Sequence, residues 1–138
     1  MAPAPEQLIE KLKSIVGDDG VLDAEAMSRR AASYWDSTPL SARALVRPRS
    51  TEEVSAVVKL CAAAGQSVVT HGGLTGCVEG GLAAADDLIL SLERMNSIED
   101  IDPIGRTATV QAGAILQQVQ EAVAAHRLLF PLDLGARG

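Results

Sequence analysis

A glycine-rich segment, residues 71–77, has the residue types and spacing best suited to binding a ligand in this sequence. Its members are His71, Gly72, Gly73, Leu74, Thr75, Gly76 and Cys77. Residues without a Cβ reach positive φ angles easily and let several backbone N–H groups approach a bound anion. Only His71 can carry a positive charge between residues 65 and 88, so backbone amides must supply most of the attraction. The segment is therefore a candidate phosphate-binding loop.

The common nucleotide motifs do not fit this segment. A Walker loop requires Lys and then Ser or Thr after its last glycine, but Cys77 and Val78 follow Gly76. A Rossmann fingerprint places three glycines at fixed positions before a helix, and His71 occupies the first of these positions. The glycines alone leave a second interpretation open, a flexible connection between two strands that binds no ligand.

The elements on either side favour the binding interpretation. Residues 44–47 read as a strand, and Ser50 with Glu53 forms a capping box before an apolar helical stripe that ends at Gly65. Residues 67–70 read as the next strand. A strand-helix-strand unit of this length favours parallel pairing of the two strands. The glycine-rich segment then begins at the carboxyl end of a strand, where ligands bind in open α/β sheets.

The rest of the chain predicts a mixed architecture. Helices are expected over residues 8–16, 23–33 and 113–126, a buried strand over residues 88–92, and an antiparallel hairpin over residues 97–111 with one wet face. Cys61 lies on an apolar helical stripe and is expected in the core. We expect Tyr34 and Trp35 to pack on the domain surface rather than to stack on a ligand.

Composition excludes several classes of protein. The chain has 138 residues, the size of one domain, and 12 Lys and Arg against 18 Asp and Glu give a net charge of −6. The basic residues are scattered, so nucleic acid is not an expected partner. The two cysteines belong to no metal-binding spacing, and no run of apolar residues is long enough for a transmembrane segment. Without a signal peptide at its start, the chain is expected in the cytoplasm.

Five short motifs occur in an order that resembles one family, the FAD-linked oxidases of the vanillyl-alcohol-oxidase type, and within it the D-2-hydroxy-acid dehydrogenase branch. That branch includes D-2-hydroxyglutarate dehydrogenase, D-lactate dehydrogenase and the glycolate oxidase flavin subunit. The motifs cover residues 47–54, 72–76, 90–96, 109–113 and 129–133. The flavin subunit of a molybdenum hydroxylase shares the general fold but matches residues 94–96 and 130–132 less well.

The resemblance implies an α+β fold: the N-terminal part of a two-subdomain FAD-binding domain, with a small parallel strand-helix-strand sheet followed by antiparallel strands. It implies a helical segment at residues 1–42 and an FAD-binding domain at residues 43–138, truncated at its C-terminal side. Residues 71–77 then wrap the FAD pyrophosphate through main-chain N–H groups, and Pro131 and Leu132 approach the flavin nucleotide. Some relatives attach the flavin through a His at the position of Thr75, so non-covalent FAD is expected here.

The resemblance also implies an activity, hydride transfer from a D-2-hydroxy acid to FAD. The substrate binds through a separate cap domain, and an unidentified acceptor takes the electrons. The family's catalytic and metal-binding residues lie beyond Gly138, so none is assigned, and the 138-residue chain alone is expected to be inactive. Glu79 stands where glycine is common in relatives, and it is expected either to point to solvent or to weaken binding.

The alternative is a truncated, non-catalytic α/β fragment or module that no longer binds flavin. Missing strands are then expected to leave apolar residues uncovered at 88–92 or 128–134.

Overall fold

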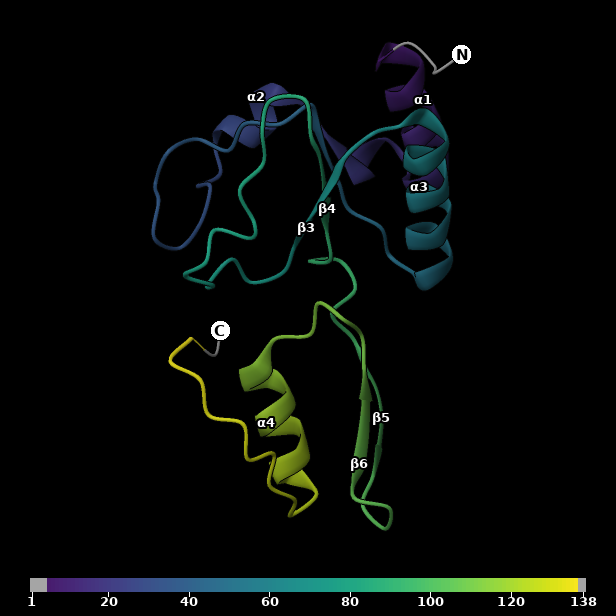
Figure 1. Cartoon of the computed structure of the whole chain (residues 1–138). Helices are drawn as coiled ribbons and strands as arrows, with labels where there is room; N and C mark the ends of the chain where they lie inside the picture. Colours follow the sequence, from purple (N-terminus) through teal and green to yellow (C-terminus); the bar gives the residue numbers. More distant parts are fainter. Residues whose placement is uncertain (1–4, 137–138) are drawn as a thin grey trace. The chain divides into compact units, whose positions relative to one another are not determined.

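The computed structural model describes residues 5–136 of the chain. They belong to two compact units, Met1–Arg94 and Met95–Gly138, and each is described by itself (Figure 1). None of the helices in the described residues is long and apolar enough to cross a membrane. Residues 5–136 also contain no cluster of side chains suited to holding a metal ion.

The first unit begins with helix α1 (Pro5–Val16), whose apolar side chains recur at helical spacing. Leu8, Leu12 and Val16 are buried in a core cluster that includes residues of α3 and of the sheet. Gly17 follows with a φ angle of 80°, a conformation that glycine adopts without strain, and the short 3-10 helix η1 (Asp18–Gly20) comes next. The helix predicted over residues 8–16 is confirmed.

A four-stranded sheet forms the centre of this unit. Its strands are β1 (Val21–Leu22), β2 (Ala44–Val46), β3 (Val68–His71) and β4 (Leu88–Ser91), in the order β1-β2-β4-β3. Strands β2 and β3 are both parallel to β4, while β1 is antiparallel to β2. The prediction that β2 and β3 run in the same direction is confirmed. The prediction that they pair with each other is wrong, because each of them pairs with β4. The four residues of β4 are all buried, and this apolar strand takes the central place between them.

Helix α3 (Thr51–Ala64) connects β2 to β3 and has the predicted ends. The Ser50 hydroxyl accepts a hydrogen bond from the Glu53 N–H at 3.2 Å, and the Glu53 carboxylate accepts one from the Arg49 N–H at 2.7 Å. Gly65 ends the helix in the left-handed conformation. Cys61 is buried in the core, as predicted.

The predicted helix over residues 23–33 is shorter in the structure. Helix α2 (Ala24–Ser28) begins after Asp23, whose side chain accepts a hydrogen bond from the Ala26 N–H at 2.9 Å. Met27 of this helix is buried with Leu40, Leu45 and Ile89 in a second core cluster. The chain then turns back on itself over residues 30–40, where the Leu40 N–H donates to the Arg30 carbonyl at 2.8 Å.

The second unit contains a hairpin and a helix. Strands β5 (Ile98–Asp102) and β6 (Thr107–Val110) pair antiparallel, as predicted, and helix α4 (Leu116–Ala125) follows. The α+β fold with a parallel sheet followed by antiparallel strands is thus confirmed. The hairpin was predicted to have one wet face and one buried face. The buried face is not observed on β6, because every residue of this strand is exposed.

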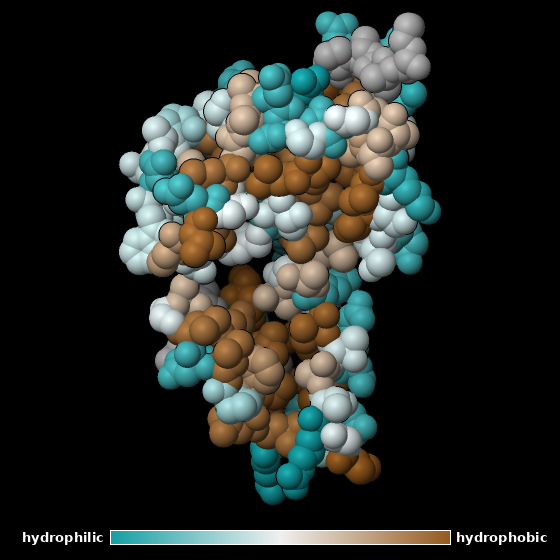
Figure 2. All heavy atoms as spheres, in the orientation of Figure 1, coloured by the Kyte–Doolittle hydropathy of each residue, from teal (hydrophilic) through white to brown (hydrophobic). Residues whose placement is uncertain are grey.

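Apolar side chains remain uncovered in the second unit. Figure 2 shows hydrophobic residues over much of the visible face of this unit. The exposed large side chains are those of Ile104, Val110, Ile115, Leu129, Phe130, Leu132 and Leu134. The expectation of uncovered apolar residues is therefore confirmed for residues 128–134. It is wrong for 88–92, where Leu88, Ile89 and Leu90 are buried in the sheet.

Candidate functional site

The glycine-rich loop, residues 72–81, leaves the carboxyl end of β3. Because β2, β3 and β4 run in the same direction, residues following all three strands lie at one edge of the sheet. The Leu92 N–H, just beyond β4, donates to the His71 carbonyl at 3.1 Å and holds the start of the loop at this edge. This edge is where ligands bind in open α/β sheets.

The backbone N–H groups of residues 72–78 find no hydrogen-bond partner in the described part of the chain. Within residues 5–136, none of the N–H groups of residues 72–78 donates a hydrogen bond. Two carbonyls of the same stretch are engaged instead: that of Leu74 accepts from the Tyr34 N–H at 3.1 Å, and that of Thr75 from the Trp35 indole N–H at 3.2 Å. The donors that an anion needs are therefore unused.

The loop also has space around its glycines. A Cβ placed on Gly72, Gly73 or Gly76 meets no other atom within 4 Å. Leu74 has a φ angle of 56°, a left-handed conformation that is uncommon for a residue with a side chain. An alternation of left-handed and ordinary backbone conformations is the arrangement in which successive N–H groups form an anion-binding nest. The loop thus has the donors and the room that a diphosphate requires.

A hollow of about 650 Å³ lies between this loop and residues 33–36. Of the predicted binding residues, four line it: Gly72, Leu74, Gly76 and Cys77. His71, Gly73 and Thr75 do not. Trp35 lines the hollow and is 65% exposed, and its neighbour Tyr34 is more exposed still. The two rings meet edge to face on the surface of this unit, and the Trp35 indole is hydrogen-bonded to the loop; that the pair does not stack on a ligand stays a prediction.

The buried side chain of His71 connects the two ends of the loop. Its side chain is 3% exposed, and its Nε2–H donates to the Gly81 carbonyl at 2.7 Å, which ties the two ends of the loop together. Burial lowers the pKa of His71 below its ordinary value, and the charge of Arg30 lowers it further, while the hydrogen bond to Gly81 and the charge of Glu93 oppose this change with smaller effects. The imidazole is therefore neutral at pH 7. The only side chain of this region able to carry a positive charge contributes none.

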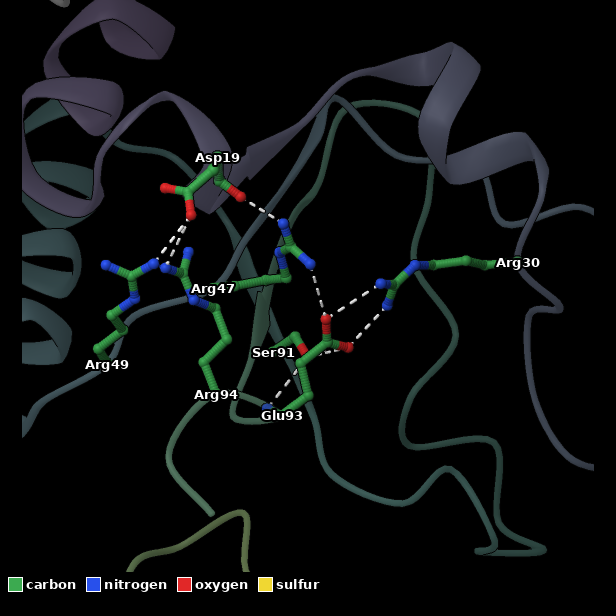
Figure 3. A network of polar contacts seen from close by, with 7 residues as sticks. All are labelled: Asp19, Arg30, Arg47, Arg49, Ser91, Glu93 and Arg94. Atoms are coloured by element: carbon green, nitrogen blue, oxygen red, sulfur yellow. Dashed lines mark hydrogen bonds and ion pairs between the residues drawn. The ribbon is translucent and has the colours of Figure 1, made fainter. Parts of the chain in front are cut away.

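Positive charge at this edge comes from arginines outside the loop (Figure 3). Glu93 accepts hydrogen bonds from both ends of the Arg30 guanidinium, at 2.7 and 3.0 Å, and from Arg47 at 3.1 Å. Hydrogen bonding to Arg30, opposed by burial and reinforced by Arg47, lowers the pKa of Glu93 to about 2. Arg30 reaches the loop region electrostatically, because its charge also lowers the pKa of His71.

Asp19 joins the same network. Its carboxylate accepts from Arg49 at 2.8 Å and from Arg94 at 3.2 Å, while its carbonyl accepts from Arg47. We call these residues the arginine network: Asp19, Arg30, Arg47, Arg49, Ser91, Glu93 and Arg94. Its guanidinium groups outnumber its carboxylates, so the network leaves positive charge at the edge that carries the loop.

Sequence reasoning missed the arginine network and the position of Trp35. One signal was available: Arg47 follows β2 directly, and Glu93 and Arg94 follow β4 after one further residue. Residues placed just beyond parallel strands gather at one edge of the sheet. No comparable signal linked Trp35 to a loop forty residues further along the chain.

Pro131 and Leu132 belong to the second unit, in the irregular segment after α4. Both are exposed, and the Leu132 carbonyl accepts a hydrogen bond from the Gln120 side chain at 2.7 Å. Their contact with the flavin nucleotide stays a prediction.

Comparison with known sequences assigns the family. The FAD binding domain family matches residues 42–138, and this chain belongs to it. The cofactor of this domain is FAD, and the unused donors and open glycines of the loop fit a group that carries a diphosphate. The division predicted between residues 42 and 43 stays a prediction.

Curated relatives are oxidoreductases of hydroxy acids. The chain is 42% identical over 116 residues to a D-2-hydroxyglutarate dehydrogenase of Xanthomonas citri pv. viticola, with 84% of this chain and 24% of that protein covered. It is 34% identical over 131 residues to a probable mitochondrial D-2-hydroxyglutarate dehydrogenase of Oryza sativa subsp. indica, with 94% and 23% covered. The chain therefore spans about a quarter of the length of the curated relatives it matches.

Solved structures confirm the fold. An alkyldihydroxyacetonephosphate synthase superposes with a TM-score of 0.76 at 18% identity, over 90% of this chain and 25% of that one. A p-cresol methylhydroxylase superposes with a TM-score of 0.65 at 22% identity, over 89% and 25%. Both similarities concern the fold alone: the arrangement of helices and strands in this chain is shared with about a quarter of each of these two enzymes.

Proposed function

We propose that this chain is the pyrophosphate-holding part of an FAD-dependent dehydrogenase that oxidises a D-2-hydroxy acid. The observation that supports this most strongly is the set of unused backbone N–H groups at residues 72–78, at the carboxyl edge of a parallel sheet. The names of relatives that are 42% and 34% identical support the substrate class. When bound, FAD supplies the redox chemistry by accepting hydride from the substrate Cα.

The chain's own part is to bind and orient the diphosphate. The amides of residues 72–78 donate to phosphate oxygens, the buried His71 holds the two ends of the loop together, and the arginine network provides a positive field. Glu79 is exposed, as expected, so its carboxylate remains in solvent. Thr75 stands where some relatives carry the His that attaches the flavin, so FAD binds this chain non-covalently in the proposal. The electron acceptor and the hydroxy acid bind to parts of the protein other than this loop.

Flavin fluorescence provides the test. FAD is titrated into the 138-residue chain and into two variants, Gly73→Asp and its uncharged isostere Gly73→Asn. A Cβ at this position meets no atom within 4 Å, so we expect both variants to fold normally, which circular dichroism checks. We expect saturable quenching with the original chain, at least about tenfold weaker binding with Gly73→Asp because like charges repel, and little change with Gly73→Asn.

Two results contradict the proposal. Equal binding by Gly73→Asp and the original chain places the diphosphate elsewhere. Absence of saturable binding by the original chain favours the alternative, a module that no longer holds flavin. The exposed apolar side chains at residues 128–134 are the observation that favours this alternative.

A further inference from the structure

The segment 30–40, which precedes the family-matched region 42–138, reaches the glycine-rich loop. It does so at two consecutive peptide groups. The Tyr34 N–H donates to the Leu74 carbonyl at 3.1 Å, and the Trp35 indole N–H donates to the Thr75 carbonyl at 3.2 Å. These are the hydrogen bonds that connect the loop residues 72–78 to the rest of the described chain.

These two contacts determine the direction in which the Thr75 and Gly76 N–H groups point, because the peptide groups are planar and trans. In a trans peptide the carbonyl of one residue and the N–H of the next point to opposite sides, and the described chain has no cis peptide. Because the Leu74 and Thr75 carbonyls point toward residues 34 and 35, the Thr75 and Gly76 N–H groups point away from them. Two adjacent N–H groups on one side of a backbone bind a single anionic oxygen.

The segment that carries Trp35 is internally braced. The Ser33 hydroxyl accepts from the N–H groups of Trp35 and Asp36, both at 3.1 Å, and the Ala32 N–H donates to the Thr38 carbonyl at 2.9 Å. At the start of this segment, Arg30 donates two hydrogen bonds to the Glu93 carboxylate, at 2.7 and 3.0 Å. A braced segment loses little further entropy when it holds another loop.

We propose that Trp35 is a positioning residue for the glycine-rich loop, an inference that rests on the proposed function. With the Tyr34 N–H, its indole N–H fixes the peptides of Leu74 and Thr75, so that the Thr75 and Gly76 N–H groups bind a phosphate oxygen on the face of the loop opposite Trp35. The contribution of Trp35 is its N–H group. Stacking of its ring on the adenine or the flavin is the competing explanation.

A pair of variants separates these explanations. Trp35→Phe keeps an aromatic ring but removes the N–H donor, while Tyr34→Phe leaves the Tyr34 main-chain donor in place and serves as the control. The side chain of Trp35 is largely exposed, so the replacement does not disturb a core. Affinity for ADP is measured by calorimetry on the 138-residue chain, and ¹⁵N relaxation without nucleotide gives the order parameters of residues 72–78.

We expect Trp35→Phe to bind ADP about fivefold more weakly, the effect of losing one hydrogen bond, and to lower the order parameters of Thr75 and Gly76. Tyr34→Phe leaves both quantities unchanged. Equal affinity and equal order parameters for Trp35→Phe and the original chain overturn the inference. Failure of the proposed function is a different result: the original chain would not bind ADP. In that case the order parameters of Thr75 and Gly76 still test whether Trp35 holds the loop.

A third measurement needs no variant. The Trp35 indole N–H, the only one in the chain, is expected to exchange with solvent about tenfold more slowly than that of free tryptophan because it is hydrogen-bonded. Exchange at the rate of free tryptophan overturns the inference.

Discussion

The two units of the chain differ in how well they bury the strands they contain. In the first, every residue of β4 is buried and two core clusters cover the sheet. In the second, every residue of β6 is exposed, and the buried hydrophobic side chains among its described residues are Met95, Val119 and Val123. The loop that we assign to the diphosphate is thus supported by the well-packed unit, whereas Pro131 and Leu132 belong to the poorly packed one.

Replacing a central strand residue tests this difference with the largest expected effect. Ile89 of β4 is fully buried, so Ile89→Ala should reduce the free energy of unfolding by about 2–5 kcal/mol. Val110 of β6 is 38% exposed, and Val110→Ala should cost less than about 1 kcal/mol. Urea denaturation of both variants gives the comparison. Equal costs would mean that the two units are packed alike.

Gly20 tests packing at the junction of α1 and the sheet. A Cβ at this buried position lies 2.6 Å from the Val16 Cγ2 atom, so Gly20→Ala should lower the free energy of unfolding by about 1–3 kcal/mol. Gly72→Ala is the matched control, because its Cβ meets nothing within 4 Å. Thermal unfolding measures both. A Gly20→Ala variant as stable as the control contradicts the close contact between Gly20 and α1.

Acid should weaken the first unit through Glu93. Its pKa is lowered from 4.5 to about 2, so its contribution to stability is complete above pH 4.5 and is lost as the pH falls toward 2. Since this carboxylate is partly exposed, the loss is about 1–2 kcal/mol after allowance for solvent screening. Glu93→Gln should show the loss already at neutral pH and a weaker dependence of melting temperature on pH in this range.

The control for that experiment is Glu99→Gln, which changes an exposed residue of β5 in the second unit. It should keep the pH dependence of the original chain. A Glu93→Gln variant that follows the same pH curve as the original chain rules out the arginine network as the source of acid sensitivity.

The smallest effect is expected at the turn of the β5–β6 hairpin. Ile104 is 95% exposed there, and Ile104→Ser should change the free energy of unfolding by less than about 0.5 kcal/mol. Chemical denaturation measures this, and light scattering reports any gain in solubility from removing an exposed apolar side chain. A loss above 1 kcal/mol would show that the turn packs against other residues.

Local sequence signals predicted the elements that position the loop. The capping pair Ser50 and Glu53, the stop at Gly65 and the β-branched residues before His71 all act within a few residues of the chain. The order of strands depended instead on competition for the centre of the sheet, which β4 occupies because all its residues are apolar or buried. Short-range patterns contain no information on that competition.

The parts of the candidate site contributed by distant residues were not predicted for the same reason. Arg30 meets Glu93 across 63 positions of sequence, and Trp35 meets Thr75 across 40. His71 was identified from its type as a possible cation, but burial, which composition does not reveal, lowers its pKa and removes the charge.

The central claim is that the N–H groups of residues 72–78, which have no partner among residues 5–136, bind a diphosphate. The most direct measurement is a titration of the ¹⁵N-labelled 138-residue chain with inorganic pyrophosphate, followed through its backbone amide resonances. We predict saturable shifts that are largest within residues 72–78, with the hairpin turn at residues 103–106 as an unaffected internal reference. Shifts that are absent from the loop, or no larger there than in the hairpin turn, would contradict the account.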